Sequence, residues 1–421
     1  MSRVVISFLG DPDKVGRAAY LIRGSKSILI DYGVELTKPP KFPILVPPHY
    51  IDLFILSHSH LDHIGAAPTL YLHGNIPALM TKPTLELGEL LIKDFIKLSG
   101  EYLPYEYLDF MNLANNTHFL TYKKNFSIND VSITFLDAGH IPGSCQVIVE
   151  IDGKRILYTG DINTYDTRLQ NVADLNYEEE FDAVIIESTY AADVHPPRKK
   201  LERLFVKTAE EVVEDGGIAL VPAFAVGRSQ EILLILYHRK FSYNITMDGM
   251  ALEATKILLN NPGYIKNYKV LKKAFKKIRK VYRWKERKKV IKEPGLIIAP
   301  AGMLGGGAAV YYINKLYKDP KNAIFLVGYQ APGSPGRNLL EARKLKIEER
   351  EKEVVASIYY MQFSAHTDSN GLKKVLSSLR GDPKIYIVHG ERRGREALYR
   401  IASEEYGFKA YMPMTGEKYE V

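Results

Sequence analysis

The sequence predicts an α/β protein in which one α/β unit is inserted into another. Three observations lead to this fold class. Short strand-like runs separated by turns fill the first half of the chain, helix and strand patterns alternate from about residue 193, and strand-like runs return after about residue 354. We therefore expect a first unit formed by residues 1–192 and 354–421, with an inserted unit over residues 193–353.

The first unit is expected to be rich in strands. One group of apolar runs near the N-terminus comprises VVISFLG, AAYLIRG, SILIDYG and IDLFILS, and a second comprises VSITFLDAGH, CQVIVEIDG, KRILYTGD and FDAVIIEST. The Asp-Gly pair at 152–153 predicts a tight hairpin between two strands of the second group. Between the groups, apolar residues spaced by three and four predict a helical region from Pro68 to Gly100.

The inserted unit is expected to contain parallel strands joined by helices. PPRKKLERLFVKTAEEVVEDGG predicts a helix, and IALVPAFAV predicts a strand followed by a helix that starts near Gly227. GLIIAPAG and NAIFLVGYQ predict buried strands, each followed by a glycine-rich turn. After residue 354, VASIYYMQF and KIYIVHG predict the returning strands, with the helix GLKKVLSSLR between them.

Composition is ordinary for a soluble globular protein, with 46% hydrophobic and 25% charged residues. The single Cys145 excludes an internal disulfide and a cysteine-based zinc cluster, and it fits a reducing cytosol. No uninterrupted apolar run approaches the ~18 residues that a membrane span needs. We therefore expect a cytoplasmic protein without membrane contact.

Charge is distributed unevenly along the chain. The net charge is +8, yet residues 266–292 contain 14 Lys or Arg and one acid, Glu286, which makes this segment +13 and the remainder −5. A localised basic block favours a polyanionic partner such as a nucleic acid. A solvated helix face is the alternative interpretation.

The motif HSHLDH, residues 58–63, carries four metal-binding side chains directly after the apolar run IDLFIL. If the chain is still extended there, His58 and His60 point the same way. The turn that follows lets Asp62 and His63 point at a second position ~3.5–4 Å away, the usual spacing of a two-metal site. Imidazole and carboxylate ligands suit zinc, with manganese as the alternative.

Three further candidate ligands end predicted strands. His140 ends VSITFLDAGH, Asp161 ends RILYTGD and His389 ends KIYIVHG, at positions where α/β sheets place their active sites. Each alone is equally consistent with a structural polar residue, but together they complete two coordination spheres. A carboxylate such as Asp161 can bridge two cations, which would acidify a shared water to a pKa of ~7.

These motifs resemble the metallo-β-lactamase fold, and the second half of the chain narrows the resemblance to the β-CASP nucleases. The narrower similarity rests on ESTY (187–190), HPPR (195–198), PAFAVGRSQE (222–231), PAGMLGGGAAVYY (300–312), GYQAPGSPGR (328–337), FSAHTD (363–368) and VHGE (388–391). Within that family the chain is most similar to archaeal homologues of the endonuclease subunit of the cleavage and polyadenylation specificity factor, in a form without KH domains, with RNase J next. The resemblance implies a metallo-β-lactamase αββα sandwich with an inserted β-CASP α/β domain.

The resemblance also assigns roles to the candidate ligands. It implies that one zinc ion is held by His58, His60 and His140, the other by Asp62, His63 and His389, and that Asp161 bridges both. Two Zn²⁺, with Mn²⁺ as the alternative, are therefore the expected cofactors.

The resemblance further implies a catalytic set made of His366, Glu187 and Asp62. His366 would be the general acid that protonates the leaving 3′ oxygen, and Glu187 would orient its imidazole. Asp31, at the end of SILIDYG, would support the metal ligands without binding metal itself. A plain strand-end cap is the alternative role for Asp31.

Candidate substrate-binding residues follow other predicted strands. Gly305 and Gly306, in GMLGGG at the start of a predicted helix, allow backbone N–H groups to approach a phosphate, although most glycine turns are only tight connections. The Ser364 hydroxyl is a further candidate phosphate contact. Arg228 and Arg337, both beside a glycine, are candidate clamps on the RNA backbone, with ordinary salt bridges as the alternative.

The expected activity is hydrolysis of phosphodiester bonds in single-stranded RNA during RNA processing or decay, by endonucleolytic cleavage, 5′→3′ exonucleolytic cleavage or both. The products would carry 5′-phosphate and 3′-hydroxyl ends. The resemblance allows a homodimer, and RNA-processing or exosome-type partners stay unidentified. The alternatives are an inactive RNA-binding scaffold subunit, which usually lacks metal ligands, a small-molecule metallohydrolase, which does not need the insertion, and a DNA-processing nuclease, whose branch has Val in place of His389.

Overall fold

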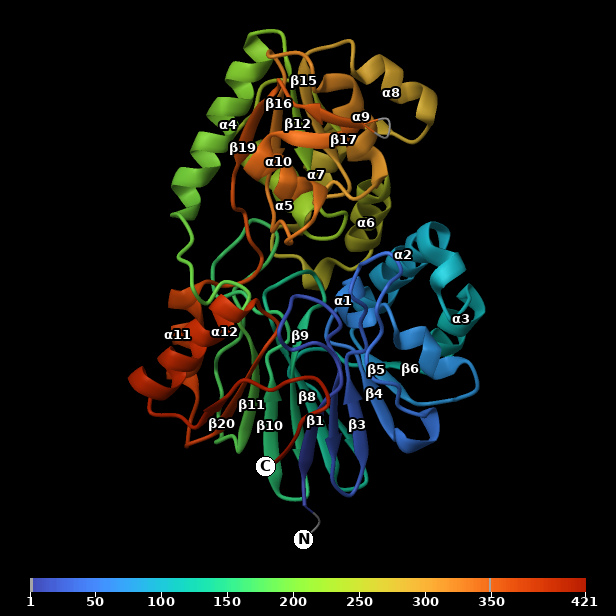
Figure 1. The fold of residues 1–421 in the computed structure, drawn as a ribbon, viewed down its shortest axis with the longest axis vertical. Helices are drawn as coiled ribbons and strands as arrows, with labels where there is room; N and C mark the ends of the chain where they lie inside the picture. Colours follow the sequence, from blue (N-terminus) through green and yellow to red (C-terminus); the bar gives the residue numbers. More distant parts are fainter. Residues whose placement is uncertain (1–2, 348–349) are drawn as a thin grey trace. The chain divides into compact units, whose positions relative to one another are not determined.

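The computed structural model describes residues 3–347 and 350–421 and divides the chain into two compact units (Figure 1). The first unit comprises Met1–Asp166, Asn171–Val194 and Ala365–Val421, and the second comprises Thr167–Gln170 and His195–Ser364. Within the described ranges, no helix is long and apolar enough to cross a membrane.

The first unit contains two seven-stranded sheets. In order across the first sheet, the strands are β22 (Lys418–Glu420), β1 (Val5–Phe8), β2 (Tyr20–Arg23), β3 (Ser27–Ile30), β4 (Leu53–Ile55), β5 (Ala78–Met80) and β6 (Thr117–Phe119). In order across the second sheet, they are β21 (Ala410–Tyr411), β20 (Lys384–Val388), β11 (Ala183–Glu187), β10 (Lys154–Tyr158), β9 (Cys145–Ile151), β8 (Val131–Asp137) and β7 (Asn125–Ile128).

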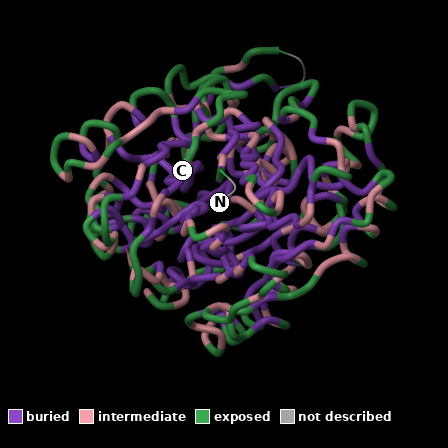
Figure 2. The backbone as a smooth tube through the Cα atoms, turned by 90° about the horizontal axis from the view of Figure 1, so that it is seen from below, coloured by how far each residue is buried: buried purple, intermediate pink, exposed green. Residues whose placement is uncertain are grey.

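Alternation along the strands of the first unit buries both faces of each sheet. In β3, Ile28 and Ile30 join a core shared by the two sheets, whereas Leu29 joins the layer beneath the helices. The helices are α1 (Leu61–Ile64), α2 (Lys82–Ser99), α3 (Tyr107–Asn115), α11 (Ser369–Ser378) and α12 (Arg392–Arg400). Helices α2 and α3 pack on the first sheet, and α11 and α12 pack on the second, which gives an αββα sandwich (Figure 1). Buried segments accordingly run through the interior of the chain, and exposed ones lie at its periphery (Figure 2).

The predicted strands of the first unit are confirmed, including the tight hairpin between β9 and β10. Asp152 (φ 51°) and Gly153 (φ 76°) both adopt the left-handed conformation that a two-residue hairpin turn requires. The predicted helix from Pro68 to Gly100 is wrong in its first part, because β5 is a buried strand and α2 begins only at Lys82. Gly74 and Pro77 interrupt the helical pattern before β5, and proline disfavours the helical conformation of the residue before it.

The second unit contains a six-stranded parallel sheet. In order, its strands are β14 (Arg279–Val281), β13 (Ile245–Asp248), β15 (Gly295–Ala299), β12 (Ile218–Pro222), β16 (Ala323–Leu326) and β19 (Ser357–Tyr360). The helices are α4 (Arg198–Glu214), α5 (Arg228–His238), α6 (Met250–Leu259), α7 (Tyr268–Lys277), α8 (Trp284–Val290), α9 (Gly307–Leu316) and α10 (Pro335–Ala342). Strands β17 (Lys344–Ile347) and β18 (Arg350–Glu353) form a separate antiparallel pair.

Helices cover both faces of the parallel sheet. Ile324 of β16 packs with Tyr312 of α9 on one face, whereas Phe325 points to the other face and lies 5.4 Å from Phe205 of α4. The return to the first unit occurs at Ala365 rather than at residue 354. The reason is that β19 pairs in parallel with β16 and so completes the sheet of the second unit.

Candidate metal centre

The HSHLDH segment leaves the first sheet at the end of β4 and turns at once into a short helix. His60 keeps an extended backbone conformation and immediately precedes α1, which contains Asp62 and His63. This change from extended to helical backbone directs the four side chains of the motif to two neighbouring positions. The expectation that His58 and His60 converge is met, since His58 Nε2 and His60 Nδ1 lie 3.2 Å apart.

The second sheet supplies the remaining side chains. Strands β10, β11 and β20 run parallel, so their carboxyl ends meet at one edge. Asp161 follows β10, Glu187 is the last residue of β11, and His389 directly follows β20. His140 comes from the loop after β8. All seven residues that we expected to bind metal therefore lie in the first unit and come together there.

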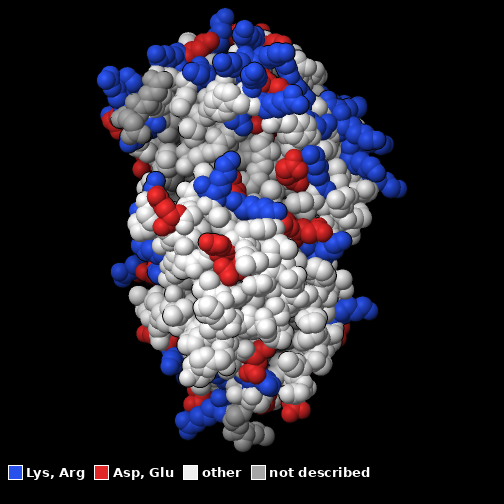
Figure 3. All heavy atoms as spheres, turned by 90° about the vertical axis from the view of Figure 1, so that its right-hand side faces the viewer, with Lys and Arg blue, Asp and Glu red and all other residues white. Residues whose placement is uncertain are grey.

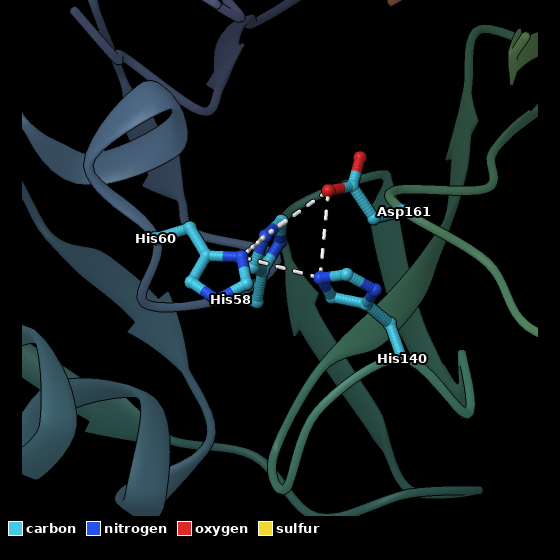
Figure 4. Close-up of side chains that lie close together, drawn as sticks. All are labelled: His58, His60, His140 and Asp161. Atoms are coloured by element: carbon cyan, nitrogen blue, oxygen red, sulfur yellow. Dashed lines mark hydrogen bonds and ion pairs between the residues drawn. The ribbon is translucent and has the colours of Figure 1, made fainter. Parts of the chain in front are cut away.

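One cluster consists of His58, His60, His140 and Asp161 (Figure 4). His140 Nε2 lies 3.2 Å from His60 Nδ1, and Asp161 Oδ2 lies 3.4 Å from His58 Nε2 and 3.6 Å from His140 Nε2. A tetrahedral zinc site with metal–nitrogen distances of ~2.0–2.1 Å has ligand–ligand edges of ~3.3 Å. The donor atoms of this cluster are therefore spaced as the corners of such a site.

A second cluster consists of Asp62, His63 and His389, and it faces the other oxygen of Asp161. His389 Nε2 lies 3.3 Å from both His63 Nε2 and Asp62 Oδ2. Asp161 Oδ1 lies 3.4 Å from His63 Nε2 and 3.5 Å from His389 Nδ1. Because Oδ2 faces the first cluster and Oδ1 the second, the Asp161 carboxylate stands between the two sets of donors.

Burial and charge suit this arrangement to cations. Asp161 is 2% exposed, and its Oδ1 accepts no hydrogen bond from the described residues. Burial lowers the pKa of His60 to about 3 and also lowers the pKa of His58 and His140, so these imidazoles present lone pairs at neutral pH. Buried imidazole nitrogens that face one another at 3.2–3.3 Å, beside an unsatisfied carboxylate oxygen, fit divalent cations such as zinc.

Asp31 lies behind the second cluster and accepts four hydrogen bonds. Its Oδ2 accepts from His63 Nδ1 (2.7 Å), Ser57 Oγ (2.7 Å) and Tyr158 OH (2.8 Å), and its Oδ1 accepts from the backbone N of Ser57 (2.8 Å). Fixing the proton of His63 on Nδ1 leaves Nε2 facing His389 and Asp161. Asp31 therefore contacts the candidate ligand His63 directly, and its carboxylate oxygens accept four hydrogen bonds in all.

His366 and Glu187 form a pair at the edge of the centre. His366 Nδ1 donates to the Glu187 carboxylate at 2.9 and 3.0 Å, and His366 Nε2 lies 3.8 Å from Asp161 Oδ2. Glu187 is itself held by the backbone N of Ile162 (2.7 Å) and by Thr189 Oγ1 (2.6 Å). Burial lowers the pKa of His366, but the Glu187 and Asp161 carboxylates outweigh it and raise that pKa to about 9. The two carboxylates thus favour the protonated form of His366, and the Glu187 hydrogen bonds fix the orientation of its imidazole.

Three side chains that support the centre were not predicted from the sequence. Ser57 contacts both Asp31 and His58 Nδ1 (3.1 Å), Tyr158 donates to Asp31, and Thr189 lies 3.2 Å from His389 Nδ1 while donating to Glu187. Thr189 belongs to the ESTY motif at the end of a predicted strand, and this position was the one feature of the sequence that could have identified it as a supporting residue.

The five residues expected to bind substrate lie in the second unit. Each follows the carboxyl end of a parallel strand: Arg228 after β12, Gly305 and Gly306 after β15, Arg337 after β16 and Ser364 after β19. Arg337 is paired with Glu341 (2.6 Å). A Cβ added to Gly305 or Gly306 meets open space, so neither glycine is required by the packing of the protein.

Comparisons with known protein families match three segments that together cover 336 of the 421 residues. Residues 12–173 match the metallo-beta-lactamase superfamily, residues 229–339 match the Beta-Casp domain, and residues 351–413 match the Zn-dependent metallo-hydrolase RNA specificity domain.

Three curated relatives are each similar to this chain over at least 92% of its length. The chain is 37% identical over 418 residues to RNase aCSPSF2 of Saccharolobus solfataricus, with 98% of this chain and 84% of that protein covered. It is 36% identical to Probable RNase MJ4 of Methanocaldococcus jannaschii, covering 99% of this chain and 100% of that protein. It is 34% identical to transcription termination factor FttA of the same organism, covering 92% of this chain and 67% of that protein.

A solved structure shares the fold. It is described as a protein of unknown function from Enterococcus faecalis V583, and it matches with a TM-score of 0.64 at 13% identity, covering 100% of both chains. At this identity the likeness concerns the fold alone.

Proposed function

The chain belongs to the β-CASP family of the metallo-β-lactamase superfamily, and from that premise we propose that it is a metal-dependent ribonuclease that hydrolyses phosphodiester bonds of single-stranded RNA. The observation that carries the proposal is the convergence of two sets of His and Asp donor atoms on the opposite oxygens of Asp161, beside the His366–Glu187 pair. Relatives named as RNases and the match to an RNA specificity domain support RNA as the substrate.

The proposed cofactors are two zinc ions, with manganese as the alternative. One would be held by His58, His60 and His140, the other by Asp62, His63 and His389, with Asp161 shared. Bound there, the cations would supply Lewis-acid stabilisation of the phosphate charge and a water acidic enough to attack at neutral pH. Histidine and carboxylate donors at tetrahedral spacing support zinc in preference to calcium or magnesium, which take oxygen ligands.

In the proposed reaction, a water that has released one proton to the solvent attacks the phosphorus, a P–O bond to its oxygen forms, and the bond from phosphorus to the 3′ oxygen breaks. His366 Nε2, which faces the cluster, donates its proton to the leaving 3′ oxygen. Glu187 keeps that proton available by accepting from Nδ1 and by raising the pKa of His366. The products then carry a 5′-phosphate and a 3′-hydroxyl.

The residues of the second unit are proposed as contacts to the RNA backbone. Arg228, Arg337, Ser364, Gly305 and Gly306 share the carboxyl edge of its parallel sheet, the edge at which α/β sheets bind ligands. The backbone N–H groups at the start of α9, directly after Gly306, favour a phosphate. Ser364 is 8% exposed and Arg228 is 7% exposed, so both have little freedom to reorient.

An inactive scaffold is the second candidate function, and the intact donor set weighs against it. Each expected ligand is present, buried or half-buried, and turned toward its cluster. A small-molecule metallohydrolase would leave the matches to the Beta-Casp and RNA specificity domains without a role. A homodimer and a cytoplasmic location stay predictions.

The experiment that tests the proposal uses 5′-labelled single-stranded RNA with either one or three 5′ phosphates. Wild-type protein and His366→Ala are compared with and without a chelator. Mononucleotides released only from monophosphorylated RNA would identify a 5′-phosphate-dependent exonuclease, and internal fragments from both RNAs would identify an endonuclease. The absence of any metal-dependent product would contradict the proposal and favour the scaffold.

A further inference from the structure

The basic segment of the second unit presents two exposed aromatic rings around the start of α8. Tyr282 is 56% exposed and Trp284 is 57% exposed. Arg283, Lys285, Lys288 and Lys289 are exposed around them. We call these six residues the α8 surface. Two aromatic rings exposed side by side within a cluster of cations form a surface that is suited to a partner, whereas a single exposed ring such as Tyr50 is common.

The backbone of the α8 surface is fixed. The Glu286 carboxylate accepts from the backbone N of Tyr282 (2.9 Å) and of Arg283 (3.1 Å), which closes the first turn of α8. Glu286 is the one acid among residues 266–292, and these hydrogen bonds give it a structural role. The two aromatic side chains therefore project from an ordered turn.

A buried network fastens α8 to the parallel sheet. Arg287 donates to Asp248 at the end of β13 through Nε (2.7 Å) and Nη2 (3.0 Å), and Tyr312 of α9 donates to the same carboxylate (2.7 Å). Asp248 is 1% exposed. The Trp284 ring lies 4.5 Å from the Tyr311 ring and 4.9 Å from the Arg287 guanidinium. Trp284 is thus supported from the protein side while more than half of its surface stays accessible.

The positive charge of the α8 surface favours an anionic partner. Lys and Arg side chains gather over the second unit on the face that includes α8 (Figure 3). A second copy of the chain would bring the same cations face to face, which disfavours self-association through this surface. A flat aromatic ring beside cations is suited to a nucleobase with its phosphate, since bases stack on aromatic rings and phosphates pair with Lys and Arg.

The position of the surface within the sheet agrees with a ligand site. Tyr282 directly follows β14, so the α8 surface lies at the carboxyl edge of the parallel sheet, where α/β sheets bind ligands. The contact between Trp284 and Tyr311 joins it to α9, whose N-terminus is at the same edge.

We propose that the α8 surface is a binding platform for single-stranded RNA, on which bases stack against Tyr282 and Trp284 while the surrounding Lys and Arg side chains pair with phosphates. The inference rests on the proposed function for its choice of RNA, since single-stranded DNA offers the same chemistry. Binding here requires no cation at the His and Asp clusters, because none of the six residues belongs to them.

Trp284 is the only tryptophan in the chain, so its fluorescence reports directly on this surface. The full-length protein is titrated with unlabelled oligo(U) of 15 nucleotides in the presence of a chelator, which prevents hydrolysis. We expect saturable quenching of Trp284, and similar quenching by oligo(dT). Inorganic polyphosphate, which has charge and no bases, should quench little. Equal quenching by poly-glutamate or by anionic lipid vesicles would overturn the proposal in favour of a protein or membrane partner.

Tyr282→Ala keeps the tryptophan reporter and removes one stacking ring. Loss of one base stack should weaken oligo(U) binding by about five-fold or more. Tyr50→Ala is the matched control, since Tyr50 is also 56% exposed and lies in the first unit. Thermal melting confirms that both variants are folded. Equal oligo(U) affinity of the two variants would overturn the proposal.

Two assays on the same preparations separate this proposal from the proposed function. Quenching by oligo(U) without RNA cleavage by the zinc-loaded protein supports the platform and contradicts the ribonuclease. Cleavage without quenching contradicts the platform and leaves the ribonuclease supported. RNA binding by two further variants is measured by the anisotropy of labelled RNA. Trp284→Phe keeps an aromatic ring and should keep most of the RNA affinity, whereas Trp284→Ala removes the ring and should lose most of it.

Discussion

The two units use charged side chains in opposite ways. In the candidate metal centre of the first unit, Asp161 and His63 are almost fully buried, and Asp31 accepts a hydrogen bond from His63. On the α8 surface of the second unit, Lys285, Lys288 and Lys289 are exposed. Packing and hydrogen bonds fix the positions of the buried groups relative to one another. The exposed cations would instead attract a partner through their combined charge, to which each contributes a part. Removing one buried group should therefore abolish metal binding and cleavage, whereas removing one exposed cation should only weaken RNA binding.

The largest expected effect comes from Asp161→Asn. The amide keeps the size of the side chain but removes the charge that faces both clusters. We expect loss of both metal ions and a fall in RNA cleavage of at least ~10³-fold, because several kcal/mol of charge stabilisation depend on the cations. Metal content by mass spectrometry and single-turnover cleavage measure the two effects. Asp382→Asn, at an exposed carboxylate of the same unit, is the control and should change neither.

His366→Ala should separate proton transfer from metal binding. Without the proton donor, cleavage should fall by ~10²–10⁴-fold while the metal content stays at the wild-type value. The control is His49→Ala, at an exposed histidine of the same unit. Loss of metal together with activity would show that His366 is a ligand rather than the general acid.

Asp31→Asn tests how far metal binding depends on a residue that contacts a candidate ligand, His63, without belonging to either cluster. An amide cannot accept from His63, Ser57 and Tyr158 as the carboxylate does, and its NH₂ group opposes the proton on His63 Nδ1. Metal affinity should fall by ~10–100-fold. Tyr158→Phe removes one of the same hydrogen bonds and should have a smaller effect. Equal effects of the two variants would contradict the ordering of His63 by Asp31.

Replacing Lys285, Lys288 and Lys289 together by Gln should show the additive behaviour of the exposed cations. RNA binding measured in a chelator should weaken, and the slope of log K against log salt should decrease by ~0.7 for each phosphate that these cations no longer neutralise. Hydrolysis of a small chromogenic phosphodiester should be unaffected. The matched control replaces Lys199, Lys200 and Lys207, which are exposed on α4 of the same unit. An equal change of slope in that control would place the binding charge elsewhere.

The smallest expected effect on RNA cleavage concerns Asp137, which lies at the end of β8 and outside the two His and Asp clusters. Burial raises the pKa of Asp137, the hydrogen bond from the Gly139 backbone N lowers it, and Asp174 raises it, to about 6 in total. The folded state therefore holds this proton more tightly than the unfolded state, and the stability present below pH ~4 is lost as the pH rises to about 6. Asp137→Asn should remove that loss, with a gain of about 3 kcal/mol at pH 7 and none at pH 3. Urea unfolding at several pH values measures it, and a gain that does not depend on pH would contradict the assignment.

The sequence predicted the fold and the residues of the two candidate metal clusters because both depend on local patterns. HSHLDH places four donors within one turn of chain, and strand-end positions identify Asp161 and His389. The supporting residues depend on how distant segments meet. Tyr158 reaches Asp31 across 127 positions of sequence, and no local pattern distinguishes it from another strand tyrosine. The predicted boundary near residue 354 could not take the pairing of β19 with β16 into account, since the partner of a strand is decided by the whole sheet rather than by the strand's own sequence.

The proposed roles of His366 and Glu187 came from a resemblance rather than from their own spacing. They lie 179 positions apart, and their hydrogen bonds arise only when the end of β11 meets the loop before α11. The basic segment was visible as a charge run that favours a nucleic-acid partner, but the sequence did not single out Tyr282 and Trp284, because their accessibility is a property of the folded second unit.

The most direct test of the central claim is a zinc titration of metal-free protein with single-stranded RNA cleavage as the readout. We expect no cleavage without metal, a rise with added zinc and a plateau at two equivalents, with Asp161→Asn inactive throughout. Cleavage by the metal-free protein, or no cleavage at any zinc content, would contradict it.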